Sequence, residues 1–137
     1  MSKEIIRVRD VMKRDFDMVD GMATVAEALQ NMNFIETKTL IVNKRHEDDE
    51  YGIVTLSGVA SQVLAADRAP ERVNIYEVMT KPAFTVDPEM NIRYCARMFE
   101  HFGLVRAPVV EHRTVIGIVS MSDMVLKGLG SGDLETD

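Results

Sequence analysis

The most constraining feature of this sequence is that it contains one pattern twice. Val11-Met12 recurs 67 residues later as Val78-Met79. Farther along, Gly52–Ser57 (GIVTLS) recurs 65 residues later as Gly117–Ser122 (GIVSMS). A repeated pattern indicates one structural unit that stacks on its own copy. We therefore expect two similar halves related by a pseudo-twofold axis, with a cleft between them that a ligand could occupy.

Each half also contains apolar residues at helical spacing. They recur at i, i+3, i+4, i+7 and i+10, which places them on one face of a helix. Thr24 and Asn91 stand directly before these stripes, and their side-chain oxygens predict the two N-caps. The single cysteine, Cys95, is expected to be a buried core residue, because it lies within the second stripe. The stripes are Val25, Ala28, Leu29, Met32 and Ile35, and Ile92, Cys95, Ala96, Phe99 and Phe102.

Short apolar runs around these helices predict strands, and each half ends in a second helix. The unit reads β-α-β-β-α, an α/β fold whose first two strands are parallel and joined by a right-handed crossover. We expect repeat 1 in residues 1–66, a linker in 67–72, repeat 2 in 73–129 and a mobile acidic tail in 130–137. The expected strands are Met18-Val19, Leu40–Val42, Ile53–Thr55, Phe84–Val86, Ala107–Val110 and Val115–Val119, and the second helices run from about Ser57 to Ala66 and from Ser122 to Leu129.

Composition limits the class of protein. With 137 residues, 46% of them hydrophobic, the chain can form one compact domain and is too short for two independent ones. No stretch of about 18 apolar residues predicts a membrane span, and the N-terminal residues lack the apolar core of a signal peptide. A net charge of −6 argues against nonspecific nucleic-acid binding, which depends on basic surface. One cysteine excludes an intrachain disulfide, so a reducing, cytoplasmic protein is expected.

The order of elements is similar to that of a known family. Its double occurrence, together with the run GIVSMSD at Gly117–Asp123, resembles a tandem pair of cystathionine-β-synthase-type (CBS) domains, also called a Bateman module. The resemblance covers roughly Arg7 to Leu129. It implies a regulatory fold that binds adenosine-containing ligands such as AMP, ADP, ATP or S-adenosylmethionine in clefts between repeats. Such modules usually have no chemistry of their own, and no required cofactor is expected.

Ser120, Ser122 and Asp123 are the main candidate site residues that this resemblance implies. In the family, an Asp at the strand-to-helix junction accepts hydrogen bonds from both ribose hydroxyls, which suits a carboxylate because it is acceptor-only and has two oxygens. Ser120 would contact the ribose or the first phosphate, and free N–H groups at the helix start would add phosphate affinity. The alternative needs no ligand: Ser122 is a suitable N-cap, and Asp123 stabilises the first turn of a helix.

The first repeat departs from this pattern at one position. Thr55 and Ser57 match Ser120 and Ser122, but Gly58 stands where the second repeat has Asp123. Without a carboxylate, the first ribose site should be weak or empty. Gly58 could instead ease a tight strand-to-helix turn, and both interpretations predict the same functional asymmetry.

The resemblance implies further pocket residues. Thr80, Ala83 and Phe84 belong to the segment that lines the adenine in the family. Arg106, Ala107 and Pro108 match the segment entering the second strand, where an arginine commonly reaches phosphate because its guanidinium suits a bidentate contact. A solvated surface position explains Arg106 equally well. Four other cations could face the cleft, although a polar turn or an exposed face explains each more simply: Lys13, Arg14, His112 and Arg113.

An enzyme is not expected, because the sequence contains no nucleophile elbow, Gly-rich phosphate loop or dinucleotide fingerprint. His46, His101 and His112 show no metal-ligand spacing, so no metal site is assigned. The carboxylates of Glu47–Glu50 crowd one turn, which is typical of a solvated loop, although a weak divalent-cation site is conceivable.

Three hypotheses of function remain. The favoured one is a stand-alone adenosine-nucleotide sensor that docks on a regulated protein whose identity the sequence does not give. The second is a ligand-free module of the same fold that serves oligomerisation or protein interaction. The third is an enzyme of unrecognised type. We also expect a homodimer, because we do not expect short helices to bury all their apolar residues within one small module. Those residues include Met32, Phe34, Phe99 and Phe102.

Overall fold

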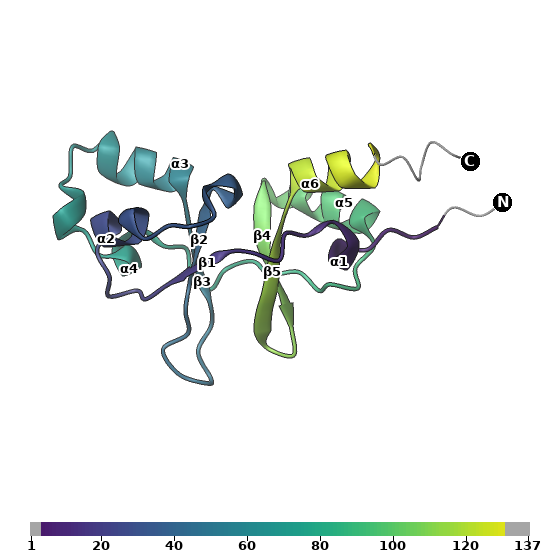
Figure 1. Ribbon diagram of the computed structural model, residues 1–137, viewed down its shortest axis with the longest axis horizontal. Coiled ribbons are helices and arrows are strands. Elements are labelled where there is room, and N and C mark those ends of the chain that lie inside the picture. Colours follow the sequence, from purple (N-terminus) through teal and green to yellow (C-terminus); the bar gives the residue numbers. More distant parts are fainter. Residues whose placement is uncertain (1–3, 131–137) are drawn as a thin grey trace. The chain divides into compact units, whose positions relative to one another are not determined.

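Two α/β units make up residues 4–130, which the computed structural model describes (Figure 1). The continuous unit consists of Asp15–Ala83. The split unit combines the described residues up to Arg14 with those from Phe84 onward. Most of the expected mobile tail, residues 131–137, lies outside the described residues. Within each unit the α-helices lie on one side of the strands (Figure 1).

The continuous unit has the expected β-α-β-β-α order. Strand β1 pairs in parallel with β2, and β2 pairs in antiparallel with β3, so the sheet order is β1-β2-β3. Two further short elements, which sequence patterns did not predict, follow the second helix of this repeat. The elements are β1 (Asp17–Val19), α2 (Val25–Gln30), the 3-10 turn η1 (Ile35–Thr37), β2 (Thr39–Val42), β3 (Gly52–Thr55), α3 (Leu56–Val59) continuing as the π-helical turn η2 (Ala60–Leu64), the 3-10 turn η3 (Pro70–Arg72) and α4 (Ile75–Val78).

The split unit has the same order but lacks a regular first strand. Its elements are α1 (Val8–Val11), α5 (Ile92–Phe102), β4 (Arg106–Glu111), β5 (Thr114–Ser120) and α6 (Met121–Gly128). The strand expected at Phe84–Val86 is reduced to one parallel bridge between Val86 and Val109. The rungs on either side would need N–H donors from Pro88 and Pro108, and proline has none. The prediction of a strand there is therefore wrong.

The compact units cut across the predicted repeats, because each repeat's opening segment folds with the other repeat's first helix. In the split unit, the Val8 N–H donates to the Met90 carbonyl at 2.8 Å. In the continuous unit, the Ile75 N–H donates to the Ala23 carbonyl at 2.8 Å, and these two residues are the repeat equivalents of Val8 and Met90. The linker predicted at 67–72 is thus part of the continuous unit.

The two first helices differ in length, and a buried carboxylate explains the difference. Asp17 accepts hydrogen bonds from the N–H groups of Asn33 at 2.9 Å and Phe34 at 2.8 Å, which holds the chain in a turn soon after α2 ends. The second repeat has Phe84 at the position of Asp17. There α5 continues for 11 residues, to Gly103 in the left-handed conformation.

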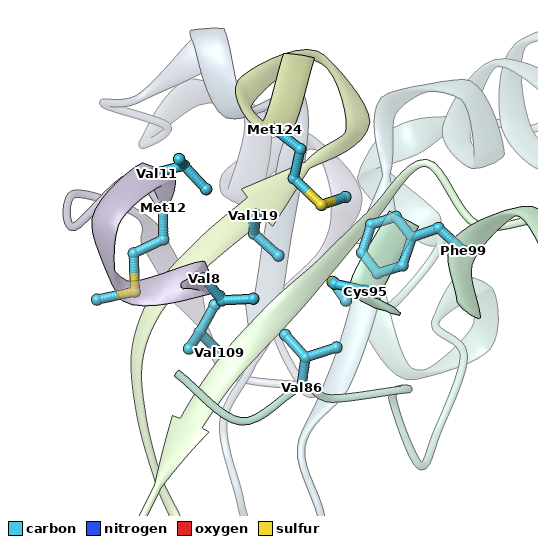
Figure 2. Packing of buried hydrophobic residues seen from close by; sticks show 10 residues of the cluster. Val8, Val11, Met12, Val86, Cys95, Phe99, Val109, Val119 and Met124 are labelled. Carbon is cyan, nitrogen blue, oxygen red and sulfur yellow. The ribbon is translucent and has the colours of Figure 1, made fainter. Parts of the chain in front are cut away.

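Each unit has its own hydrophobic core, and the two apolar stripes contribute to them. Figure 2 shows the split unit's core, where Val8, Val11 and Met12 pack with residues from Val86 onward, including Phe99. Cys95 is buried there, as predicted. The ends of both stripes are not core: the Ile35 and Phe102 side chains are exposed, because α2 stops early and Phe102 is the last helical residue. No helix within residues 4–130 is long and apolar enough to cross a membrane.

Candidate functional site

The strand-to-helix junction between β5 and α6 contains the main candidate residues. The Ser120 Oγ accepts a hydrogen bond from the Asp123 N–H at 3.0 Å and so caps α6, which begins at Met121. The alternative that made Ser122 the N-cap is therefore wrong, and Ser122 is exposed. The predicted caps Thr24 and Asn91 are confirmed, since their side chains accept from Glu27 N–H and Arg93 N–H.

Asp123 lies in the first turn of α6 with only 5% of its surface exposed. Its Oδ1 accepts a hydrogen bond from the Lys13 Nζ at 2.6 Å, and the Lys127 Nζ lies 3.8 Å from the same oxygen. None of the described residues donates a hydrogen bond to Oδ2. A carboxylate oxygen can accept two hydrogen bonds. Asp123 thus has a structural partner and keeps acceptor capacity for a ligand.

Backbone pairing holds Lys13 beside this carboxylate. The Lys13 N–H donates to the Ile118 carbonyl at 2.8 Å, and the Ile118 N–H donates back to the Lys13 carbonyl at 2.9 Å. The neighbouring Gly117 permits this approach, because a Cβ there would lie 2.6 Å from the Lys13 carbonyl oxygen. The interpretation of Lys13 as an ordinary surface cation missed this contact. Comparison of the repeats could have revealed it, because Lys13 follows Val11-Met12 as Thr80 follows Val78-Met79, and Thr80 was already a candidate site residue.

The equivalent junction in the continuous unit has the cap without the charges. The Thr55 Oγ1 accepts from the Gly58 N–H at 3.0 Å, as Ser120 does from Asp123. Thr80 pairs with Ile53 through two backbone hydrogen bonds, as Lys13 pairs with Ile118. Gly58 does not have the positive φ that favours glycine; among the described glycines only Gly103 does. The backbone conformation at this turn therefore does not require glycine, which was the basis of the alternative that Gly58 eases the turn.

The other candidates divide between the two units. Arg106 is the cross-strand partner of Ser120, and Ala107 and Pro108 follow it as buried residues of β4. Phe84 packs against the split unit's core, with its ring centroid 5.3 Å from that of Phe102. Thr80 and Ala83 belong instead to the continuous unit, where the Ala83 N–H donates to the Tyr51 carbonyl at 2.8 Å. The structure thus brings Lys13, Arg106, Ser120 and Asp123 into one unit.

The acidic turn after β2 is not a uniformly solvated loop, because Asp49 is buried. Its Oδ2 accepts from the Arg45 N–H and Nε, both at 2.9 Å, and from the Lys81 Nζ at 2.7 Å. These hydrogen bonds, led by the Arg45 side chain, hold the pKa of the Asp49 carboxyl well below its usual range. Among the described residues, no three His, Cys, Asp or Glu side chains form a group able to hold a metal ion.

Comparison with known proteins identifies relatives of this arrangement. The profile of the CBS domain family matches residues 75–129. The structure of the hexameric CBS-CP12 protein from bloom-forming cyanobacteria is 37% identical, with a TM-score of 0.85, and the match covers 90% of this chain and 71% of that one. The CBS domain pair of protein MJ0100, solved with 5′-methylthioadenosine and S-adenosyl-L-methionine, has a TM-score of 0.76 at 23% identity, over 93% of this chain and 98% of that one.

Among curated proteins, the uncharacterized protein MK0525 of Methanopyrus kandleri is 26% identical over 88% of this chain and 61% of its own length. The chain spans about three fifths of the length of the first curated relatives that it matches.

Proposed function

This chain belongs to the CBS domain family as a domain pair, and from that premise we propose that it is a regulatory module that binds an adenosine nucleotide, AMP, ADP or ATP. Asp123 accepts hydrogen bonds from the ribose hydroxyls, and Ser120 lies beside it at the same junction. The module acts by changing how it docks on a regulated protein, and it has no catalytic activity of its own. We place it in the cytoplasm, without nucleic-acid or membrane binding.

The observation that carries this proposal is the state of the Asp123 carboxylate. Burying a charged carboxylate is unfavourable unless it is paired and hydrogen-bonded. Asp123 is 5% exposed, and the described residues use only one of its two oxygens. The second oxygen can receive a donor from a ligand, and a vicinal diol supplies two O–H donors at the spacing of a carboxylate. The MJ0100 domain pair, which shares this fold, was solved with two adenosine-containing ligands.

The asymmetry between the units supports one principal site. Gly58 supplies no side-chain acceptor at the position of Asp123. Without the carboxylate, the continuous unit retains only the hydroxyls of Thr55 and Ser57, which hydrogen-bond to each other at 3.2 Å. We expect about one tightly bound nucleotide per chain.

Isothermal titration calorimetry with AMP, ADP, ATP and S-adenosylmethionine tests the proposal directly. Asp123→Ala should remove binding of all nucleotides that the parent binds. Asp87→Ala is the matched control, since it removes an exposed carboxylate from the same unit. The Asp87 carboxylate accepts a hydrogen bond from the Glu89 backbone N–H. This variant should bind as the parent does. Nucleotide at about a hundred times its dissociation constant should stabilise the parent by roughly 2.7 kcal/mol.

Two results would contradict the ribose assignment: an Asp123→Ala protein that binds as tightly as the parent, or a parent that binds none of these compounds. Loss of the Lys13 ion pair should lower the stability of unliganded Asp123→Ala by about 1 to 2 kcal/mol. Binding is therefore measured at a temperature where circular dichroism shows that both variants are folded.

Assembly is a second candidate role, favoured by exposed apolar side chains on α6. On α6, Val125 is 52% exposed and Leu126 is 69% exposed, and Leu129, which directly follows the helix, is 70% exposed. Such residues are typical of an interface. The residues expected to drive assembly were partly wrong, since Phe99 is fully buried. We propose a homodimer through this face; the related CBS-CP12 protein is hexameric.

A further inference from the structure

Lys13 has donor capacity that the protein does not use. An ammonium group has three N–H donors, and Lys13 gives one of them to Asp123 Oδ1 at 2.6 Å. No other described residue accepts a side-chain hydrogen bond from it. Its side chain is 29% exposed, so a ligand at Asp123 can reach the remaining donors. These donors stand beside the carboxylate that we assign to the ribose.

The base of this side chain is fixed. Lys13 exchanges two backbone hydrogen bonds with Ile118, at 2.8 and 2.9 Å, and its backbone lies so close to Gly117 that a Cβ there would be 2.6 Å from the Lys13 carbonyl oxygen. Asp123 is fixed in turn by the Ser120 cap. A positioned charge recognises a ligand at a smaller entropic cost than a mobile one does.

The charges around Asp123 favour an anion, although the whole chain carries a net charge of −6. Two ammonium groups, those of Lys13 and Lys127, lie within 4 Å of one carboxylate. The carboxylate neutralises only one of them. The excess positive charge therefore lies next to the proposed ribose position.

The two repeats differ at both residues of the Lys13–Asp123 ion pair. The continuous unit has Thr80 in place of Lys13 and Gly58 in place of Asp123, although the backbone pairing and the hydroxyl cap are kept. The fold therefore does not need the ion pair at this junction. The pair is specific to the unit in which we place the ligand.

We infer that Lys13 is a specificity-determining residue that binds the phosphate of the nucleotide whose ribose Asp123 holds. The inference rests on the proposed function. A 5′-phosphate is only a few bonds from the ribose hydroxyls, so an ammonium group hydrogen-bonded to the ribose-binding carboxylate lies within reach of it. The site then selects phosphorylated nucleosides over neutral nucleosides and over the cationic sulfonium of S-adenosylmethionine.

Titration of the parent, Lys13→Thr and Lys13→Arg with AMP and with adenosine tests this selectivity. The parent should bind AMP about tenfold more tightly than adenosine, the size expected for one charge-assisted hydrogen bond. Lys13→Thr introduces the residue that the other repeat has at this position. It should weaken the binding of AMP but not that of adenosine, so that the two affinities become similar. Lys13→Arg should keep most of the preference. Lys127→Thr, which removes the same charge from the longer contact, should change the AMP affinity less than threefold.

The outcomes separate this inference from the proposed function. If the parent and Lys13→Thr prefer AMP over adenosine equally, Lys13 does not bind phosphate and the nucleotide site stands without it. If Lys13→Thr binds both ligands more tightly, Lys13 competes for Asp123, and the inference is wrong. If the parent binds neither AMP nor adenosine, the inference fails, and the proposed function stands only if the parent binds ADP or ATP in the calorimetry described above. Should Lys13→Thr not fold, a parent that binds AMP and adenosine equally still overturns the inference.

Discussion

Gly117→Ala should destabilise the protein far more than an ordinary glycine substitution in a strand. The added Cβ would lie 2.6 Å from the Lys13 carbonyl oxygen and 2.8 Å from the Met12 Sδ. The sulfur can move, but the carbonyl belongs to a backbone that pairs with Ile118 on both sides. Overpacking of this kind costs about 1 to 3 kcal/mol, and disturbing the two hydrogen bonds adds about 1 kcal/mol. We expect a total loss of about 2 to 4 kcal/mol.

Gly52→Ala is the control, because Gly52 is the repeat equivalent of Gly117. Its Cβ would lie 3.0 Å from the flexible Met79 Sδ, 3.2 Å from the Val42 Cβ and 3.4 Å from the Thr80 carbonyl oxygen, so no contact is as short as the 2.6 and 2.8 Å contacts at Gly117. The distance to the backbone carbonyl is an ordinary contact, so the cost should be near 1 kcal/mol. Urea unfolding followed by circular dichroism measures both values. A Gly52→Ala variant that loses as much free energy of unfolding as Gly117→Ala would refute the reasoning.

Three further predictions follow from the same contacts. Gly58→Asp should raise the number of nucleotides bound per chain from one toward two in calorimetry, since the φ of Gly58 suits an L residue; an unchanged stoichiometry in a folded variant would show that other residues close that site. Asp49→Asn should reduce the loss of stability that acid causes. The pKa of Asp49 is lower in the folded than in the unfolded protein, so its ion pairs stabilise the fold above the unfolded pKa of about 4, and this stabilisation is lost as pH falls toward the folded pKa. A variant whose melting temperature falls between pH 7 and 3 as steeply as the parent's would contradict this. Sedimentation at micromolar concentration should show a dimer that Leu126→Glu dissociates, and a monomeric parent would exclude the α6 interface.

Local patterns were sufficient to predict most elements. The stripe around Cys95 became the core face of α5, and Thr24 and Asn91 cap their helices as predicted. At two places where local patterns failed, a residue outside the predicted element was responsible. The strand expected at Phe84–Val86 does not extend beyond the bridge between Val86 and Val109, because Pro88 and Pro108 lack the N–H groups that the next rungs need. Helix α2 is short because Asp17 binds the chain that follows it.

The sequence by itself determined that this chain is a twofold-repeated α/β protein and that Asp123 and Gly58 occupy equivalent junctions. These are properties of periodicity and of order along the chain, and they need no knowledge of contacts. Only the tertiary structure decided that Lys13 meets Asp123 across 110 residues of sequence. That contact exists because the opening segment of one repeat folds with the strands of the other, and because Gly117 lets its backbone approach β5.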